Sequence, residues 1–253
     1  MSDTSAGWLL GGKVRYRQPR QGFRSGIEPV LLAAWVPARP GEPVLEAGTG
    51  AGAGLLCLAA RIPGIRGVGV ERDPVLVELA RENLAANGFR GILVLEADIE
   101  ALAVGEKSEG QKFAHAFANP PWHDAAGTPP SHPGRVGAKR GGERLAAWIS
   151  GLARQVAPRG TLTLVLPAAR VADALAATAA AGCGSVALFP FWPRLGSPAK
   201  LVLVRAVRGG RGPLALLAGL VLYGPDGRFT AEAEAVLRGG AALAPGAPPT
   251  KLV

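Results

Sequence analysis

Short apolar runs alternate with longer amphipathic segments along most of this chain. Apolar runs bounded by Gly, Pro or polar residues predict buried strands, and they cover 43–46, 67–71, 92–96, 113–118, 161–166, 185–191 and 200–207. Helical patterns cover 28–36, 51–62, 143–156 and 170–180, and Pro74 opens another helix that Asn87 and Gly88 close. This order predicts a doubly wound α/β sheet that ends in an antiparallel pair.

The chain is long enough to form one full-sized domain. It has 253 residues, of which 48% are hydrophobic, so it can bury a core without disulfides. We expect a single domain over 1–253, with a lead-in and helix at 1–40, a core at 41–207 and a C-terminal extension at 208–253. The extension holds an apolar run at 216–223 and a helix at 230–237. Two segments rich in polar residues, Gly or Pro, 105–111 and 123–142, predict loops.

A glycine-rich turn follows the strand at 43–46, directly after Glu46. Its glycines are Gly48, Gly50 and Gly52. A strand, a tight glycine turn and a helix bring backbone close to a nucleotide-like ligand. Two more acids follow later strands, because Glu71 ends the second strand and Asp98 follows the third. We expect Glu71 to accept hydrogen bonds from ribose hydroxyls and Asp98 to meet an adenine amine at the same sheet edge.

The strand at 113–118 ends in the tetrad Asn119, Pro120, Pro121 and Trp122. Two prolines in succession fix two φ angles and remove two N–H donors, so nearby carbonyls are free to accept hydrogen bonds. Asn119 adds a side-chain acceptor and Trp122 adds a flat apolar face. The tetrad predicts a site for a planar group that carries an NH2, although a Pro-rich structural turn is the simpler alternative.

The tetrad resembles the (Asn/Asp)-Pro-Pro-(aromatic) motif of S-adenosylmethionine-dependent amino-methyltransferases. With the glycine turn and Glu71 upstream, the chain is similar to class I methyltransferases. That resemblance implies a Rossmann-like fold with a seven-stranded mixed sheet and helices on both faces. The alternation of Gly48, Gly50 and Gly52 also approximates a dinucleotide fingerprint, with Ala53 as a tolerated replacement for the last glycine. A dehydrogenase is the less favoured alternative, because it needs no such tetrad.

Segments 11–34 and 220–230 resemble the bacterial tRNA (adenine-N6)-methyltransferases that act beside the anticodon of a valine tRNA. The chain departs from that family at Trp122, where Tyr or Phe is usual, and at Glu28, where Asp is common. The resemblance implies a tRNA substrate and S-adenosylmethionine as cofactor. It assigns catalysis to Asn119, Pro120 and Trp122. It assigns cofactor binding to Glu46, Gly48, Gly50, Gly52, Glu71, Asp98 and Asn119.

The chain is strongly basic, with a formal net charge of +9 and a pI of about 10.4. Basic side chains favour a nucleic-acid partner because they neutralise phosphates and release counterions, although an Arg-rich codon bias would also raise the pI. They form three clusters: Lys13, Arg15, Arg17, Arg20 and Arg24; Arg135, Lys139, Arg140 and Arg144; Arg205, Arg208 and Arg211. We expect Arg24 and the other N-terminal arginines, the loop around Lys139 and Arg140, and the segment from Arg205 to Arg211 to contact RNA phosphates.

The tetrad indicates the reaction better than the substrate. Protein glutamine methylation, ribosomal RNA guanine-N2 methylation and RNA binding without catalysis therefore remain alternatives. Cys57 and Cys183 lie far apart in apolar surroundings, and the N-terminus shows no secretory pattern, so we expect a reduced, cytoplasmic protein. The three histidines lack partners at metal-ligand spacing, and no metal site is expected.

Overall fold

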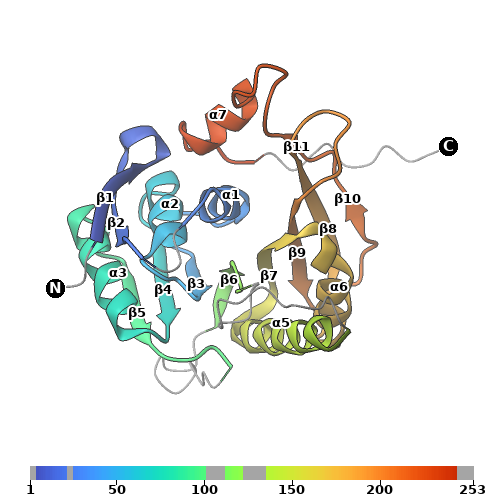
Figure 1. The fold of residues 1–253 in the computed structure, drawn as a ribbon. Coiled ribbons are helices and arrows are strands. Elements are labelled where there is room, and N and C mark those ends of the chain that lie inside the picture. Colours follow the sequence, from blue (N-terminus) through green and yellow to red (C-terminus); the bar gives the residue numbers. More distant parts are fainter. Residues whose placement is uncertain (1–3, 22–24, 101–111, 122–134, 244–253) are drawn as a thin grey trace.

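The computed structural model describes residues 4–21, 25–100, 112–121 and 135–243 (Figure 1). Within the described residues the main sheet has nine strands, two more than expected. The seven longest are β3 (Pro43–Ala47), β4 (Arg66–Glu71), β5 (Ile92–Glu96), β6 (Phe113–Ala118), β7 (Val156–Pro167), β8 (Cys183–Trp192) and β9 (Leu201–Arg208). Their order is β8-β9-β7-β6-β3-β4-β5. The strands from β3 to β7 pair in parallel, whereas β9 runs antiparallel to both β7 and β8. The predicted mixed sheet and its antiparallel pair are confirmed.

Helices cover both faces of this sheet (Figure 1). One face carries α1 (Glu28–Trp35), α2 (Ala53–Arg61) and α3 (Pro74–Ala86), and the other carries α5 (Arg135–Gln155) and α6 (Val171–Ala180). In β3, Val44 packs into the first layer and its neighbour Leu45 into the second. Burial on both faces explains why these strands appear as continuous apolar runs in the sequence. Among the described helices, none combines the length and the apolar character needed to cross a membrane.

Two helices begin close to where the sequence predicts, and each has a capping residue at its start. Asp73 accepts a hydrogen bond from the backbone N–H of Val75 (2.9 Å) ahead of Pro74, which begins α3. Thr230 accepts one from Ala233 (3.1 Å) at the start of α7 (Ala231–Leu237), which packs near α1. Such caps satisfy N–H groups that have no partner inside the helix.

The N-terminal lead-in forms a hairpin that the sequence analysis missed. Strand β1 (Thr4–Leu9) pairs antiparallel with β2 (Val14–Pro19) through a short 3-10 turn at Leu10–Gly12. Val14 and Tyr16 are buried, whereas Arg15 and Arg17 are exposed. This alternation is the ordinary signal of a half-buried strand. A two-stranded hairpin is marginally stable alone, so its contacts with the rest of the protein hold it in place.

Two predicted boundaries are wrong. The expected loop at 123–142 becomes helical at Arg135, where α5 begins, because interior glycines cost only about 1 kcal/mol each in a helix. Residues 122–134, like the predicted loop at 105–111, lie outside the described residues. The apolar run at 216–223 forms two short strands, β10 (Ala215–Leu216) and β11 (Leu220–Val221), both parallel to β8. Gly219 separates them with a φ of 78°, and a Cβ there would lie 2.1 Å from the Pro190 carbonyl oxygen.

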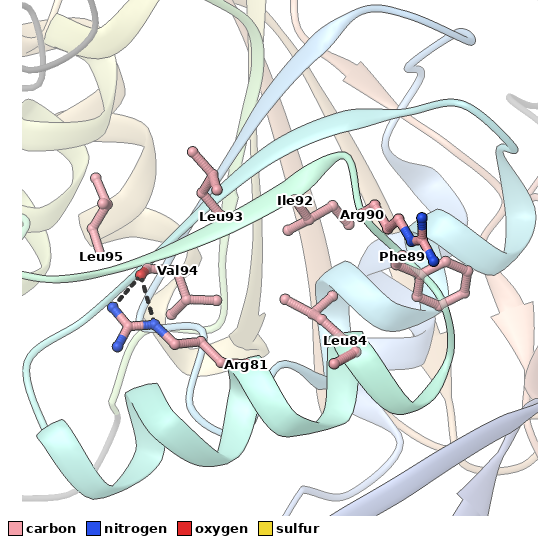
Figure 2. Close-up of a pocket in the computed structure, with 9 residues that line it drawn as sticks. Arg81, Leu84, Phe89, Arg90, Ile92, Leu93, Val94 and Leu95 are labelled. Atoms are coloured by element: carbon pink, nitrogen blue, oxygen red, sulfur yellow. Dashed lines mark hydrogen bonds between the residues drawn. The ribbon is translucent and has the colours of Figure 1, made fainter.

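Strand β5 is the outermost strand on its side of the described sheet. The carbonyl of Val94 accepts hydrogen bonds from Nε (3.3 Å) and Nη2 (2.8 Å) of Arg81, as Figure 2 shows. Leu84, Phe89 and Ile92 line the adjoining groove of about 580 Å³ between α3 and β5. None of the motif residues lines this groove, so it is separate from the candidate site described below.

Candidate functional site

Four neighbouring parallel strands bring the sequence motifs to one edge of the sheet. The strands β6, β3, β4 and β5 lie side by side in that order, and all point the same way. Asn119 and the glycine turn directly follow β6 and β3, Glu71 is the last residue of β4, and Asp98 follows shortly after β5. Chain connections diverge between β3 and β6, which is where open α/β sheets bind their ligands.

The glycine turn has a conformation that other residues rarely adopt. The φ angles of Gly48, Gly50 and Gly52 are 64°, 54° and 91°. The N–H groups of Gly48 and Thr49 donate to the carbonyl of Val70 in β4, at 2.8 and 3.1 Å. A Cβ on Gly48 would also lie 2.6 Å from the Trp148 ring of α5. Helix α2 begins directly after the turn, so its free N–H groups lie beside it.

Glu46 lies beneath this turn and is only 4% exposed. Its Oε2 accepts hydrogen bonds from Thr49 Oγ1 (2.5 Å) and the Leu55 N–H (3.1 Å). Gly54 leaves the room that the carboxyl group needs, because a Cβ there would lie 2.0 Å from Oε1. Burial raises the pKa of Glu46 to about 8 against the opposing effect of these two hydrogen bonds. The carboxyl group therefore connects the glycine turn, through Thr49, to the start of α2, through Leu55.

Glu71 and Asp98 differ in their surroundings. The Glu71 carboxylate accepts hydrogen bonds from three backbone N–H groups: Gly50 (3.0 Å), Arg72 (2.8 Å) and Asp73 (3.0 Å). Because a carboxylate offers about four acceptor positions, this arrangement leaves room for a ligand hydroxyl. Asp98 is exposed, accepts a hydrogen bond from Glu100 (2.9 Å) and does not line the pocket described next. The structure thus joins Glu71 directly to the glycine turn, whereas Asp98 is exposed and does not line the pocket.

A pocket opens between the glycine turn, Asn119 and the N-terminal hairpin. The Oδ1 atom of Asn119 is buried and has no hydrogen-bond partner among the described residues. Pro120 is buried and Pro121 is exposed, while Trp122 lies outside the described residues. A buried acceptor without a partner costs about 1–3 kcal/mol, so this oxygen favours a ligand that donates to it. Of the predicted site residues, Glu46, Gly48, Gly50 and Asn119 line this pocket.

The opposite wall comes from residues that the sequence analysis did not assign to the site. Tyr16 and Gln18 of β2 line the pocket together with Ser25. The Tyr16 hydroxyl lies 2.8 Å from Ser25 Oγ, and Gln18 Oε1 accepts a hydrogen bond from the Ser25 N–H at 3.0 Å. Burial raises the pKa of Tyr16 to about 12, so its hydroxyl stays protonated. The alternation around Tyr16 signals a strand, but nothing in it shows which element the strand covers.

The three basic clusters differ in how their members are exposed and in what they contact. The first cluster has exposed members on the hairpin: Lys13, Arg15, Arg17 and Arg20. Arg24 lies outside the described residues, and the backbone of α5 includes Lys139 and Arg140. In the third cluster, the guanidinium of Arg205 lies 4.1 Å from the Trp35 ring centroid and donates to the Trp35 carbonyl (3.1 Å).

These features fit a nucleoside-type cofactor at the sheet edge. Three left-handed glycines allow close approach of a ligand to the backbone, and the N-terminus of α2 lies beside them. Glu71 supplies a carboxylate on the adjacent strand, and Asn119 supplies an unpaired acceptor inside the pocket. Ribose hydroxyls of such a cofactor would suit Glu71, and any amine that enters the pocket would suit Asn119.

Comparison with known proteins gives concordant matches. A family model described as a methyltransferase domain matches residues 38–188. A tRNA1(Val) (adenine(37)-N6)-methyltransferase from Aeromonas hydrophila is 31% identical over 193 residues, which cover 75% of this chain and 79% of that protein. A protein of the same name from Porphyromonas gingivalis is 31% identical over 156 residues. That second match covers 60% of this chain and about 61% of the relative's length.

Solved structures show the same architecture. A predicted O-methyltransferase from Agrobacterium tumefaciens superposes with a TM-score of 0.71 at 26% identity, and the match covers 87% of this chain and all of that one. A methyltransferase from Pyrococcus furiosus, at 19% identity and a TM-score of 0.55, shares the fold. The predicted class I methyltransferase fold is therefore confirmed.

Proposed function

This chain belongs to the methyltransferase family, with tRNA1(Val) (adenine(37)-N6)-methyltransferases among its relatives, and we propose that it methylates the N6 amine of a tRNA adenosine near the anticodon. S-adenosylmethionine is the cofactor that membership implies, and when bound it supplies an electrophilic methyl group. A relative of the same name matches over 87% of the chain. Protein glutamine methylation, ribosomal RNA guanine-N2 methylation and binding without catalysis lack such support.

The buried Asn119 Oδ1 is the observation that carries the proposal. The exocyclic nitrogen of adenine is a poor nucleophile because its lone pair is delocalised into the ring. In the proposed complex, Asn119 Oδ1 accepts one N–H of this amine and the Pro120 carbonyl accepts the other. These two acceptors favour a pyramidal nitrogen whose lone pair is available for attack. Asn119 and the Pro120 carbonyl therefore contribute to catalysis by aligning the amine and stabilising its developing charge, and no strong general base is required.

The remaining predicted residues hold and orient the two substrates. The glycine turn provides backbone for the methionine end of the cofactor, and Glu71 uses its remaining acceptor position for a ribose hydroxyl. Trp122, by its place in the motif, stacks on the target base. Asp98, which follows β5, meets the cofactor's adenine amine. A base in an anticodon loop has to leave its stack to reach the pocket, and stacking on Trp122 offsets part of that cost.

The charge of the chain supports RNA as the methyl acceptor. Residues 4–21 contain four basic side chains and no acid, and their strand β2 forms one wall of the pocket. The +9 net charge provides a field that attracts phosphates. A protein substrate would gain little from these charges. We infer that tRNA backbone contacts involve the hairpin, Arg24 and the start of α5, at Lys139 and Arg140.

The test supplies purified enzyme and labelled cofactor with unmodified tRNA, ribosomal RNA and a release-factor protein in parallel. Label should appear in tRNA as N6-methyladenosine, identified by nucleoside mass spectrometry. Label found only in the protein, or only as N2-methylguanosine, would overturn the substrate assignment and leave methyl transfer standing. No label in any acceptor, with cofactor bound, would favour the non-catalytic alternative.

A variant at Asn119 separates chemistry from binding. Asn119→Ala should lower kcat by about 100-fold or more, because the lost acceptor matters most as the amine becomes nucleophilic. Its cofactor affinity should stay within about threefold of wild type. Asn119→Asp retains an acceptor and should keep more activity than the alanine variant. Near-normal turnover by Asn119→Ala would show that the tetrad is only a structural turn.

A further inference from the structure

The N-terminal hairpin is attached to the rest of the protein through Asn83 of α3 and Asn87, the residue that caps the C-terminal end of this helix. Asn83 Oδ1 accepts a hydrogen bond from the Arg17 N–H (2.9 Å), and its Nδ2 donates to the Arg17 carbonyl (2.8 Å). Asn87 makes the same pair of bonds to Arg15, at 2.9 and 2.8 Å. Each side-chain amide therefore pairs with both polar backbone groups of one β2 residue, as a neighbouring strand would.

Helix and strand geometry explain why two asparagines can do this together. Four residues of an α-helix advance about 6 Å along its axis, and two residues of a strand advance about 6.6 Å. Asn83 and Asn87 are therefore spaced nearly as Arg17 and Arg15 are. Within the described residues the hairpin is a separate two-stranded sheet, so these amides replace the strand neighbours that β2 lacks.

Asn83 makes one bond that Asn87 does not. Its Nδ2 also donates to the carbonyl of Ala51, at 2.9 Å, inside the glycine turn. Asn83 is 2% exposed and Ala51 is 6% exposed, so neither group can readily exchange its partner for water. The second bond of Asn87 Nδ2 goes instead to the Asn83 backbone carbonyl within α3, at 2.8 Å.

The two partners of Asn83 belong to opposite walls of the pocket. Arg17 lies between Tyr16 and Gln18, which line the hairpin wall, and Ala51 lines the wall formed by the glycine turn. One buried amide thus determines how far the hairpin wall lies from the turn. A change in that separation alters the fit of anything bound between the walls, without touching the reacting atoms.

We propose that Asn83 is a positioning residue that sets cofactor affinity by linking the N-terminal hairpin to the glycine turn. The inference rests on the proposed function, because it takes the pocket to be the site of a nucleoside cofactor. Asn83 acts through the turn and the hairpin, so it governs binding rather than the methyl-transfer step. Asn87 makes a matched attachment to the same strand and has no such role.

The experiment compares Asn83→Ala with Asn87→Ala. Both variants lose two hydrogen bonds to β2, so both should lower the melting temperature. Asn83→Ala should raise the Kd for S-adenosylmethionine about 10-fold or more, because the Ala51 carbonyl is left buried without a partner. Asn87→Ala should change it by less than about threefold. Calorimetry of each RNA-free variant measures its Kd for S-adenosylmethionine. Equal changes of Kd in the two variants would overturn the proposal.

Asn83→Asp covers the case in which the alanine variant does not fold. It keeps the size of the side chain and can still accept from Arg17, but as a carboxylate it cannot donate to the carbonyls of Arg17 and Ala51. Its Kd should rise at least as much as that of Asn83→Ala, and an unchanged Kd would refute the inference. With tRNA as acceptor, the KM for cofactor should rise while kcat at saturation stays within about threefold. Absence of RNA methylation would count against the proposed function. The calorimetric result tests the role of Asn83 in cofactor binding and does not depend on RNA methylation.

Discussion

Replacing Glu46 by glutamine should change how stability depends on pH. Among the described residues, Glu46 is the one acidic side chain that is buried. Its carboxyl group accepts hydrogen bonds from Thr49 and Leu55. Glutamine has the same shape and keeps an oxygen acceptor for both bonds, but it carries no titrating proton. Comparison of the two proteins therefore isolates the titration of one group.

The magnitude follows from the shift in pKa. Burial raises the pKa of Glu46 from 4.5 to about 8, so the folded state holds the proton more tightly than the unfolded state. The contribution of this group to stability is full below pH 4.5 and is lost as pH rises to about 8. At ~1.36 kcal/mol for each pKa unit, the loss is about 5 kcal/mol at most. Relaxation of the turn around the ionised carboxylate reduces it.

Urea unfolding of wild type and Glu46→Gln at several pH values between 5 and 8 measures this effect. The free energy of unfolding of wild type should fall relative to the variant by several kcal/mol over that range. Burial lowers the pKa of His115, so its protonation destabilises the folded state as pH falls below the usual 6.5. This effect is the same in wild type and in Glu46→Gln, and it therefore cancels when their free energies of unfolding are subtracted. Glu78→Gln, at a side chain 65% exposed, is the control and should track wild type. A constant gap between wild type and Glu46→Gln would refute the reasoning.

Three further outcomes follow from the site. Glu71→Ala should weaken S-adenosylmethionine binding by about 1–3 kcal/mol in calorimetry, because a charged acceptor is lost. Gly54→Ala should lower the free energy of unfolding by about 1–3 kcal/mol in urea titrations, since its Cβ would lie 2.0 Å from the Glu46 carboxyl oxygen. Reversing Lys139 and Arg140 to glutamate should weaken tRNA binding, reduce its salt dependence and leave cofactor affinity unchanged.

Each of these changes has a matched control. Glu96→Ala removes an exposed acid at the end of β5 and should leave cofactor binding unchanged. Gly7→Ala adds a methyl group where nothing lies within 4 Å and should keep wild-type stability. Arg90→Glu reverses an exposed charge that precedes β5 at its amino end, and should affect tRNA binding less than the double reversal. If a control changed binding or stability as much as its test variant does, that result would contradict the corresponding assignment.

Prediction from sequence worked where the signal is local. Pro74 and Asp73 begin α3 because one presets φ and the other caps the first N–H groups. The strand before Asn119 ends at Ala118 as its apolar run indicates. Prediction failed at Arg135, where glycines in the sequence suggest a loop and α5 begins nevertheless. Intrinsic helix propensity is a weak predictor of where α5 begins, because packing of the later turns stabilises the whole helix.

For the site, the sequence identified Gly48, Asn119 and Glu71 but not their partners. It showed neither Tyr16 and Gln18 as the opposite wall nor the burial of Glu46 beneath the turn. Arg205 carries the same charge as other basic residues, and only the structure shows that its guanidinium packs against the Trp35 ring.

The sequence by itself determined the order of strands and helices from α1 to β9, the three glycines of the turn and the placement of acids and Asn119 at strand ends. These follow from burial of apolar runs on both faces and from backbone angles that other residues avoid. The tertiary structure alone decided that Asn83 joins the hairpin to Ala51 and that Glu46 is cut off from water. Both depend on contacts between residues distant in the chain, such as Arg17 and Asn83, which no local pattern encodes.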